Sequence, residues 1–151
     1  MRLTNRLLAT LLLATATLIA GCEKSTSQPT EKPLAVTYAT LDGCWQLTMW
    51  QGTPMVEDTY LYIEFDRTQR RYTMWDNIDS MYATDTTGTF AITEEDGTYT
   101  LSGTYDYGLG DWSCDYRVEL TNKGESMRWV SLSGSHQVMD FVRVDELPEF
   151  N

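Results

Sequence analysis

Cys22 is the residue whose neighbours specify the most definite chemistry in this chain. It ends the run Leu18-Ile19-Ala20-Gly21-Cys22, which matches the bacterial lipobox: Leu, a variable residue, a small residue, Gly or Ala, then Cys. Small residues fit the groove of the signal peptidase, and the Cys thiol carries a diacylglycerol. We therefore expect lipidation at Cys22, with palmitate-type acyl chains that anchor the protein to a membrane.

The residues before Cys22 have the layout of a cleaved signal peptide. Arg2 and Arg6 precede an apolar stretch that is too short for a comfortable membrane span. A transmembrane anchor with an incidental Cys is the alternative. The expected location is the bacterial cell envelope, with the outer membrane favoured and the periplasmic or surface side left open. We therefore assign residues 1–21 to a lipoprotein signal peptide.

The charge balance limits the class of partner. The whole chain has a formal net charge of −11, and removal of residues 1–21 leaves 130 residues with nine Lys or Arg against 22 Asp or Glu. Nucleic-acid backbones are bound by an excess of basic side chains. We therefore expect no nucleic-acid partner, and a domain that anionic lipid head groups repel.

Aromatic side chains are the candidate ligand-binding groups. The segment 105–112 combines three rings and two carboxylates between two expected strands, and rings with a polar edge suit small-molecule sites. We expect a ligand mouth here and at 50–56 and 76–87. Ordinary core packing is the alternative for each ring. The tentative ligand-binding residues are Tyr105, Tyr107, Trp112, Trp75 and Tyr116.

Candidate catalytic and metal-binding residues are few. The chain has one His, His136, in an expected turn, and no Gly-x-Ser-x-Gly nucleophile elbow accompanies it. Asp106, Asp111 and Asp115 are spaced unlike the ligands of an EF-hand loop, so a solvated acidic loop is the simpler interpretation. We expect no catalytic residues, no metal site, no cofactor and no enzymatic activity.

Cys44 and Cys114 remain once Cys22 carries lipid. Two cysteines outside the cytoplasm suggest a disulfide. The strand pattern turns Cys44 outward and Cys114 inward, which places their Cβ atoms on opposite sides of a sheet. Two alternatives therefore stay open, namely a disulfide that a strand bulge makes possible and a pair of free thiols.

The elements that must position these residues are short strands. Residues 22–40 have the composition of a flexible linker after the lipidated Cys, and alternation of apolar and polar side chains begins at about residue 41. Consecutive hairpins favour an all-β, eight-stranded antiparallel up-and-down barrel over 41–151, with an open β-sandwich as the alternative. The expected strands are 43–50, 57–66, 69–77, 86–93, 98–106, 112–121, 125–133 and 137–144.

Two sequence features resemble the lipocalin (calycin) pattern. Gly43-Cys44-Trp45 starts the first expected strand, and Arg143 lies on the last one. The resemblance implies that Trp45 closes the barrel floor and that Arg143 packs across it as a cation–π cap. Residues 41–147 as a whole also resemble the lipocalin-like lipoproteins common in Bacteroidetes.

The sequence leads to two functional hypotheses. The first is a membrane-anchored, lipocalin-like binding protein for a small apolar or amphipathic ligand. The alternative is a cell-surface interaction module for glycan or protein, with a barrel that its own side chains fill.

Overall fold

The computed structural model describes residues 33–80, 82–108, 110–134 and 136–150. The chain divides into two units, residues 1–30 and 31–151, and the account below concerns the second. The expected signal peptide, the lipidation site Cys22 and the first part of the linker lie outside the described residues. None of the helices in the described part is long and apolar enough to cross a membrane.

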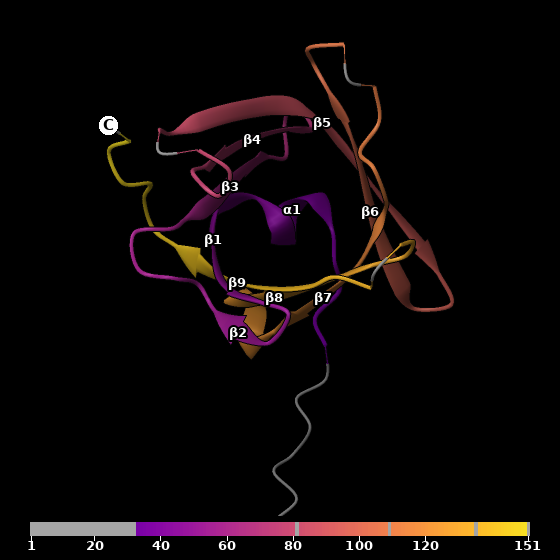
Figure 1. The fold of residues 1–151 in the computed structure, drawn as a ribbon. Helices are drawn as coiled ribbons and strands as arrows, with labels where there is room; N and C mark the ends of the chain where they lie inside the picture. Colours follow the sequence, from indigo (N-terminus) through magenta and orange to yellow (C-terminus); the bar gives the residue numbers. More distant parts are fainter. Residues whose placement is uncertain (1–32, 81, 109, 135, 151) are drawn as a thin grey trace, which may run out of the picture. The chain divides into compact units, whose positions relative to one another are not determined.

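The described chain folds into one closed antiparallel barrel (Figure 1). Neighbouring strands pair in chain order, and β1 also pairs with β9, which closes the sheet on itself. The predicted all-β barrel is therefore confirmed. The elements in order are α1 (Tyr38–Leu41), β1 (Gly43–Trp50), β2 (Thr53–Pro54), β3 (Leu61–Asp66), β4 (Arg71–Asp76), β5 (Thr84–Glu95), β6 (Thr98–Tyr105), β7 (Tyr116–Thr121), the 3-10 turn η1 (Asn122–Gly124), β8 (Ser126–Ser131) and β9 (Val138–Val144).

Eight of these strands form the ring, and β2 is a two-residue hairpin partner of β1. Two predicted strands start four residues later than expected. β3 begins at Leu61 rather than at 57, because the preceding residues turn at Asp58, whose φ is +62°. β7 begins at Tyr116 rather than at 112, because the chain before it folds back along β6.

Residues 33–40 are not part of a flexible linker, and the predicted boundary at 41 is wrong there. The Leu34 amide donates to the Leu120 carbonyl at 2.9 Å, and the Val36 side chain is buried. Thr37 and Thr40 then form a reciprocal capping box that starts α1. The segment adds apolar surface and a helical turn to one end of the barrel, which explains why it orders.

The alternating strand residues fill the barrel from every side. Side chains of opposite parity face solvent, so each strand contributes one apolar face. Figure 1 shows the strands arranged around α1. The buried apolar core consists of Val36, Leu41, Trp45, Leu47, Leu61, Ile63, Phe65, Tyr72, Phe90, Leu101, Val118, Leu120, Met127, Trp129, Met139 and Phe141.

Trp45 and Arg143 close the barrel at the α1 end, which we call the floor. The fully buried Trp45 indole donates from Nε1 to the Leu41 carbonyl at 2.8 Å. The Arg143 guanidinium lies 4.2 Å from the centroid of the indole. It also donates to three backbone carbonyls, those of Asp42 at 2.6 Å, Thr40 at 2.7 Å and Gly124 at 3.2 Å. One cation therefore joins the first turn, the η1 turn and the last strand.

Gly43 is needed beside this cation for two reasons. Its φ of +105° lies in a region that disfavours a side chain. A Cβ on Gly43 would also lie only 3.1 Å from Nη1 of Arg143. In the Gly-x-Trp motif, the glycine that starts β1 thus leaves room for Arg143. The tryptophan two positions later supplies the ring that Arg143 covers.

Cys44 and Cys114 are both free thiols, so the alternative with a disulfide is not realised. Cys44 lies on β1 and is half-buried. Cys114 lies before the start of β7, so the strand alternation used to assign its direction does not apply to it. Cys44 thus belongs to the barrel wall and Cys114 to the loop before β7.

We predict that Arg143→Met lowers the free energy of unfolding by about 3 kcal/mol, because it removes charge-assisted hydrogen bonds and leaves buried carbonyls unpaired. Urea unfolding followed by circular dichroism measures this loss. Arg128→Met is the matched control, since Arg128 pairs with Asp140 on the exposed outer wall and should cost at most about 1 kcal/mol. Equal losses in the two variants would contradict the assigned role of Arg143.

Candidate functional site

The end of the barrel opposite the floor is built from four loops, which we call the mouth loops. Antiparallel order brings together the connections 51–60, 77–83, 106–115 and 132–137, apart from residues 81, 109 and 135, which are not described. Three of them overlap the segments expected to form a ligand mouth. The fourth, 132–137, is adjacent because β8 and β9 close the ring beside β1.

A largely apolar cavity of about 170 Å³ lies inside the barrel below these loops. For comparison, an engineered cavity of roughly 150 Å³ lined by apolar side chains binds benzene, whereas sites for drug-sized molecules start at roughly 300 Å³. The cavity is therefore sized for about one ring. It is lined by Trp50, Leu61, Ile63, Met74, Tyr105, Trp112, Ser113, Tyr116, Trp129, Met139 and Phe141.

Trp112 forms one wall of the cavity, and its indole can lie there because Gly103 has no side chain. The Trp112 amide donates to the Gly103 carbonyl at 2.8 Å, so the chain before β7 runs beside the upper half of β6. A Cβ on Gly103 would overlap the Trp112 indole. The indole Nε1 donates to the Tyr72 hydroxyl at 2.8 Å, and that hydroxyl donates to the Thr104 carbonyl at 3.1 Å. Trp112 is thus held by both its backbone and its side chain.

Trp129 is the central ring of the cavity. Its ring centroid lies 5.1 Å from that of Tyr116, 5.0 Å from that of Phe141 and 5.8 Å from that of Trp112. The side chain is 2% exposed, and its Nε1–H has no hydrogen-bond partner among the described residues. A buried unpaired donor costs about 1–3 kcal/mol. Trp129 therefore holds the unpaired buried side-chain donor of the described residues.

Two tyrosine hydroxyls, that of Tyr116 in the cavity lining and that of Tyr72 bonded to Trp112, are held in the neutral form. Burial raises the pKa of Tyr116, and the neighbouring Cys114 thiol raises it further. Burial also raises the pKa of Tyr72, which outweighs the lowering caused by its bond with Trp112. Both hydroxyls therefore stay protonated at physiological pH, and neither is an available general base.

The structure brings three of the five tentative ligand-binding residues together and leaves two apart. Tyr105, Trp112 and Tyr116 line the cavity. Tyr107 is 81% exposed on a mouth loop. Trp75 faces the outer wall, because it alternates with Met74, and it stacks on Phe150 with centroids 5.3 Å apart.

Sequence reasoning missed two important lining residues, Trp129 and Met139. Trp129 alternates with Met127 and Ser131 along β8, and all three are buried. That alternation was a usable signal for an inward face. Nothing in the local pattern, however, shows that the Trp129 Nε1–H lacks a partner.

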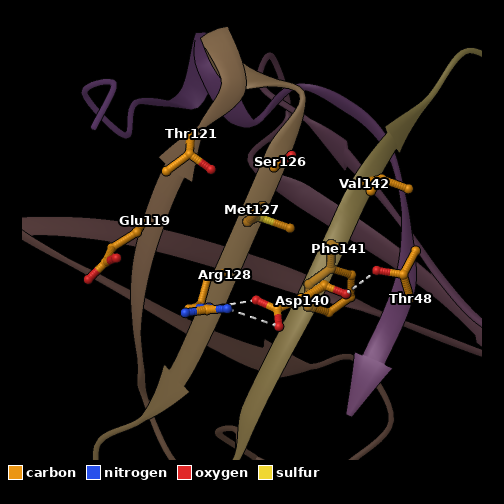
Figure 2. Close-up of a pocket in the computed structure, with 9 residues that line it drawn as sticks. All are labelled: Thr48, Glu119, Thr121, Ser126, Met127, Arg128, Asp140, Phe141 and Val142. Carbon is orange, nitrogen blue, oxygen red and sulfur yellow. Dashed lines mark hydrogen bonds and ion pairs between the residues drawn. The ribbon is translucent and has the colours of Figure 1, made fainter. Parts of the chain in front are cut away.

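A second hollow, of about 380 Å³, lies over β7, β8, β9 and β1, and Arg128, Asp140 and Thr48 bond to one another within it (Figure 2). Arg128 forms a fork with Asp140, at 2.6 Å from Nε to Oδ1 and 3.2 Å from Nη2 to Oδ2. The Thr48 hydroxyl donates to the Asp140 carbonyl at 3.0 Å. With these groups already paired, the hollow is a cross-strand contact on the barrel wall and not a candidate site.

More than half of the chain matches a known protein family. Residues 41–129 match the family described as lipocalin-like domain. A solved structure of a lipocalin-like protein from Bacteroides uniformis is similar, with 17% sequence identity, a TM-score of 0.49, and coverage of 70% of this chain and 99% of that chain. No curated protein matches the chain.

We predict that Gly103→Ala displaces the Trp112 indole from the cavity wall and lowers the free energy of unfolding by about 2 kcal/mol, as overpacking does. Urea unfolding measures the loss, and acrylamide quenching should find a larger accessible fraction of tryptophan fluorescence. Ser102→Ala, at the neighbouring strand position, is the control and should change neither. Unaltered quenching in Gly103→Ala would show that Trp112 is not held by this contact.

Proposed function

The chain belongs to the family of lipocalin-like domains, and from this we propose that its barrel binds a small, mainly apolar molecule that carries a hydrogen-bond acceptor. One observation carries the proposal. An apolar cavity of about 170 Å³ is lined by Trp129, whose buried Nε1–H has no partner among the described residues. Apolar surface drives the ligand into such a site, and one placed donor orients it.

The size of the cavity narrows the ligand class. Trp112 and Tyr116 occupy space that a long acyl chain would need, and both are packed against Trp129. A compound with about one ring fits the volume that remains. The ligand is thus a compact molecule rather than an extended lipid.

We propose that the protein acts by binding rather than by catalysis, without a cofactor. The cavity lining contains apolar side chains, a serine and two tyrosines. The raised pKa of Tyr116 makes it a poor proton acceptor at physiological pH. These features support retention of a ligand more than its conversion.

We further propose that Cys22 is lipidated and anchors the barrel to the membrane of a bacterial cell envelope. The lipobox that ends at Cys22 supports this. The folded unit starts near residue 31, so a short segment would join the lipid to the barrel. The acidic excess would keep the barrel off an anionic bilayer surface.

A surface interaction module for glycan or protein is the second candidate. It is favoured by Tyr82 and Tyr107, which are 73% and 81% exposed on the mouth loops and free to stack on a partner. Trp75, by contrast, is covered by Phe150. Glycan-array binding that is lost in Tyr107→Ala, together with an unoccupied cavity in solution, would favour this candidate.

We predict that 4-ethylphenol binds the protein in isothermal titration calorimetry and that Trp129→Phe weakens this binding about fivefold to tenfold, since one hydrogen bond contributes about 1 kcal/mol. Ethylbenzene, which has no acceptor, is the matched control and should bind both proteins alike. An equal loss for the two compounds would show that Trp129 acts through packing alone. Failure of both compounds to bind at millimolar concentration would refute the ring-sized site.

We predict that an alkyne analogue of palmitate labels the protein in bacterial cells and that Cys22→Ser abolishes both the label and recovery in the membrane fraction. Cys44→Ser serves as the control and should retain both, because Cys44 lies within the barrel wall. A wild-type protein that is unlabelled and recovered in the soluble fraction would contradict the anchor.

A further inference from the structure

A cluster of aromatic rings lies on the outer wall of β3 and β4, apart from the cavity. Tyr62 on β3 and Trp75 on β4 are opposite partners in the strand register. Both face outward, because their chain neighbours Ile63 and Met74 line the cavity. Tyr60 adjoins Tyr62, with ring centroids 5.8 Å apart. The three rings of Tyr60, Tyr62 and Trp75 form what we call the outer slot.

Phe150 fills the outer slot. Its ring stacks on that of Trp75, with centroids 5.3 Å apart and an angle of 13° between the planes. The Phe150 centroid also lies 5.4 Å from that of Tyr60 and 5.7 Å from that of Tyr62. Stacked and tilted ring pairs at these distances are favourable. The slot is therefore shaped to accept a flat aromatic side chain.

The segment that carries this ring has few other attachments to the barrel. Residues 145–150 follow β9 toward the end marked C in Figure 1 and form no regular secondary structure. Among the described residues, no backbone hydrogen bond and no ion pair joins this segment to the barrel. Leu147 and Phe150 are half-buried, and the other four residues are exposed. The contact thus depends on apolar side chains, with the Phe150 ring at its centre.

Charge does not hold the segment in place. The segment carries three carboxylates, and the wall beside the slot carries Glu64 on β3 and Asp85 on β5, which is the register partner of Trp75. Like charges repel one another. Docking of the Phe150 ring therefore works against a repulsion, which salt would screen.

The same contact is available between two copies of the chain. Every copy carries both the slot and the ring, so an exchange of segments replaces two contacts within chains by two identical contacts between chains. Six extended residues span about 20 Å. Pro148 favours extended backbone at Leu147, the residue before it. The segment is thus long enough to reach a barrel that lies alongside.

We propose that the outer slot is a docking site for residues 145–150 of a second copy of this chain, so that two barrels associate by exchanging these segments. The inference concerns the outer wall and does not depend on a ligand in the cavity. Closure within one copy competes with exchange, because a short linker gives the Phe150 ring an effective concentration on the order of millimolar. Exchange is therefore expected at high protein concentration.

Two complementary variants test the docking directly. Phe150→Ala keeps the slot and lacks the ring, whereas Trp75→Ala keeps the ring and lacks the surface on which it stacks. In NMR spectra, the indole signal of Trp75 in isotope-labelled Phe150→Ala should shift as unlabelled Trp75→Ala is added. The expected dissociation constant is on the order of a millimolar, since one ring contact supplies the binding. The shift should persist or increase in 1 M NaCl, where screening acts over about 3 Å.

The matched control is the double variant Trp75→Ala/Phe150→Ala, which should leave the Trp75 signal of the labelled protein unchanged. An amidated peptide with the sequence of residues 145–150 replaces the added protein if Trp75→Ala does not fold. In sedimentation experiments at about 1 mM protein, the weight-average mass of the wild type should rise above that of a monomer. Phe150→Ala should remain monomeric under the same conditions.

The outcomes decide between exchange and other uses of the slot. A Trp75 signal that neither the added protein nor the peptide moves would overturn the proposal. Equal shifts caused by Trp75→Ala and by the double variant would overturn the role of the Phe150 ring. A response of Phe150→Ala to methyl β-glucopyranoside, with none to the segment, would assign the slot to a sugar ring and overturn exchange. None of these outcomes alters the expected binding of 4-ethylphenol in the cavity.

Discussion

The contact between Arg143 and Trp45 is the constraint on which the rest of the barrel depends. A closed sheet has two open ends, and its core stays dry only if at least one of them is sealed. The indole fills the floor, and the guanidinium covers it at 4.2 Å while it binds carbonyls of the entering turn and of η1. The first and last strands are thereby fixed in register where they meet. The opposite end of the barrel is not sealed by this contact, and the candidate site lies there.

The mouth end is shaped by the close approach of two chain segments. Because Gly103 has no side chain, the Trp112 indole can lie against β6 and reach the Tyr72 hydroxyl. This placement reduces the interior to about 170 Å³. The same packing stabilises the wall and limits the ligand to a compact molecule, so stability and specificity here depend on one contact.

The polar groups of the site are few, and their placement carries the functional argument. Trp129 lines the cavity, and its buried Nε1–H has no partner among the described residues. The apolar interior of about 170 Å³ limits the size of the molecule that we propose as its ligand.

The sequence by itself determined the barrel, most strand positions, the floor residues and the lipobox. These features are local: side chains alternate with a period of two along a strand, and a motif is read from neighbouring positions. It predicted the conformation of two segments wrongly, with residues 33–40 as a flexible linker and residues 112–115 as part of a strand. Contacts with Leu120 and Gly103 decide the conformation of these segments instead. Only the tertiary structure decided that Tyr105, Trp112 and Tyr116 meet Trp129 around a cavity while Trp75 lies outside it. The volume of a cavity and the lack of a partner for a buried donor depend on residues far apart in the chain, and closure of the barrel is what brings those residues together.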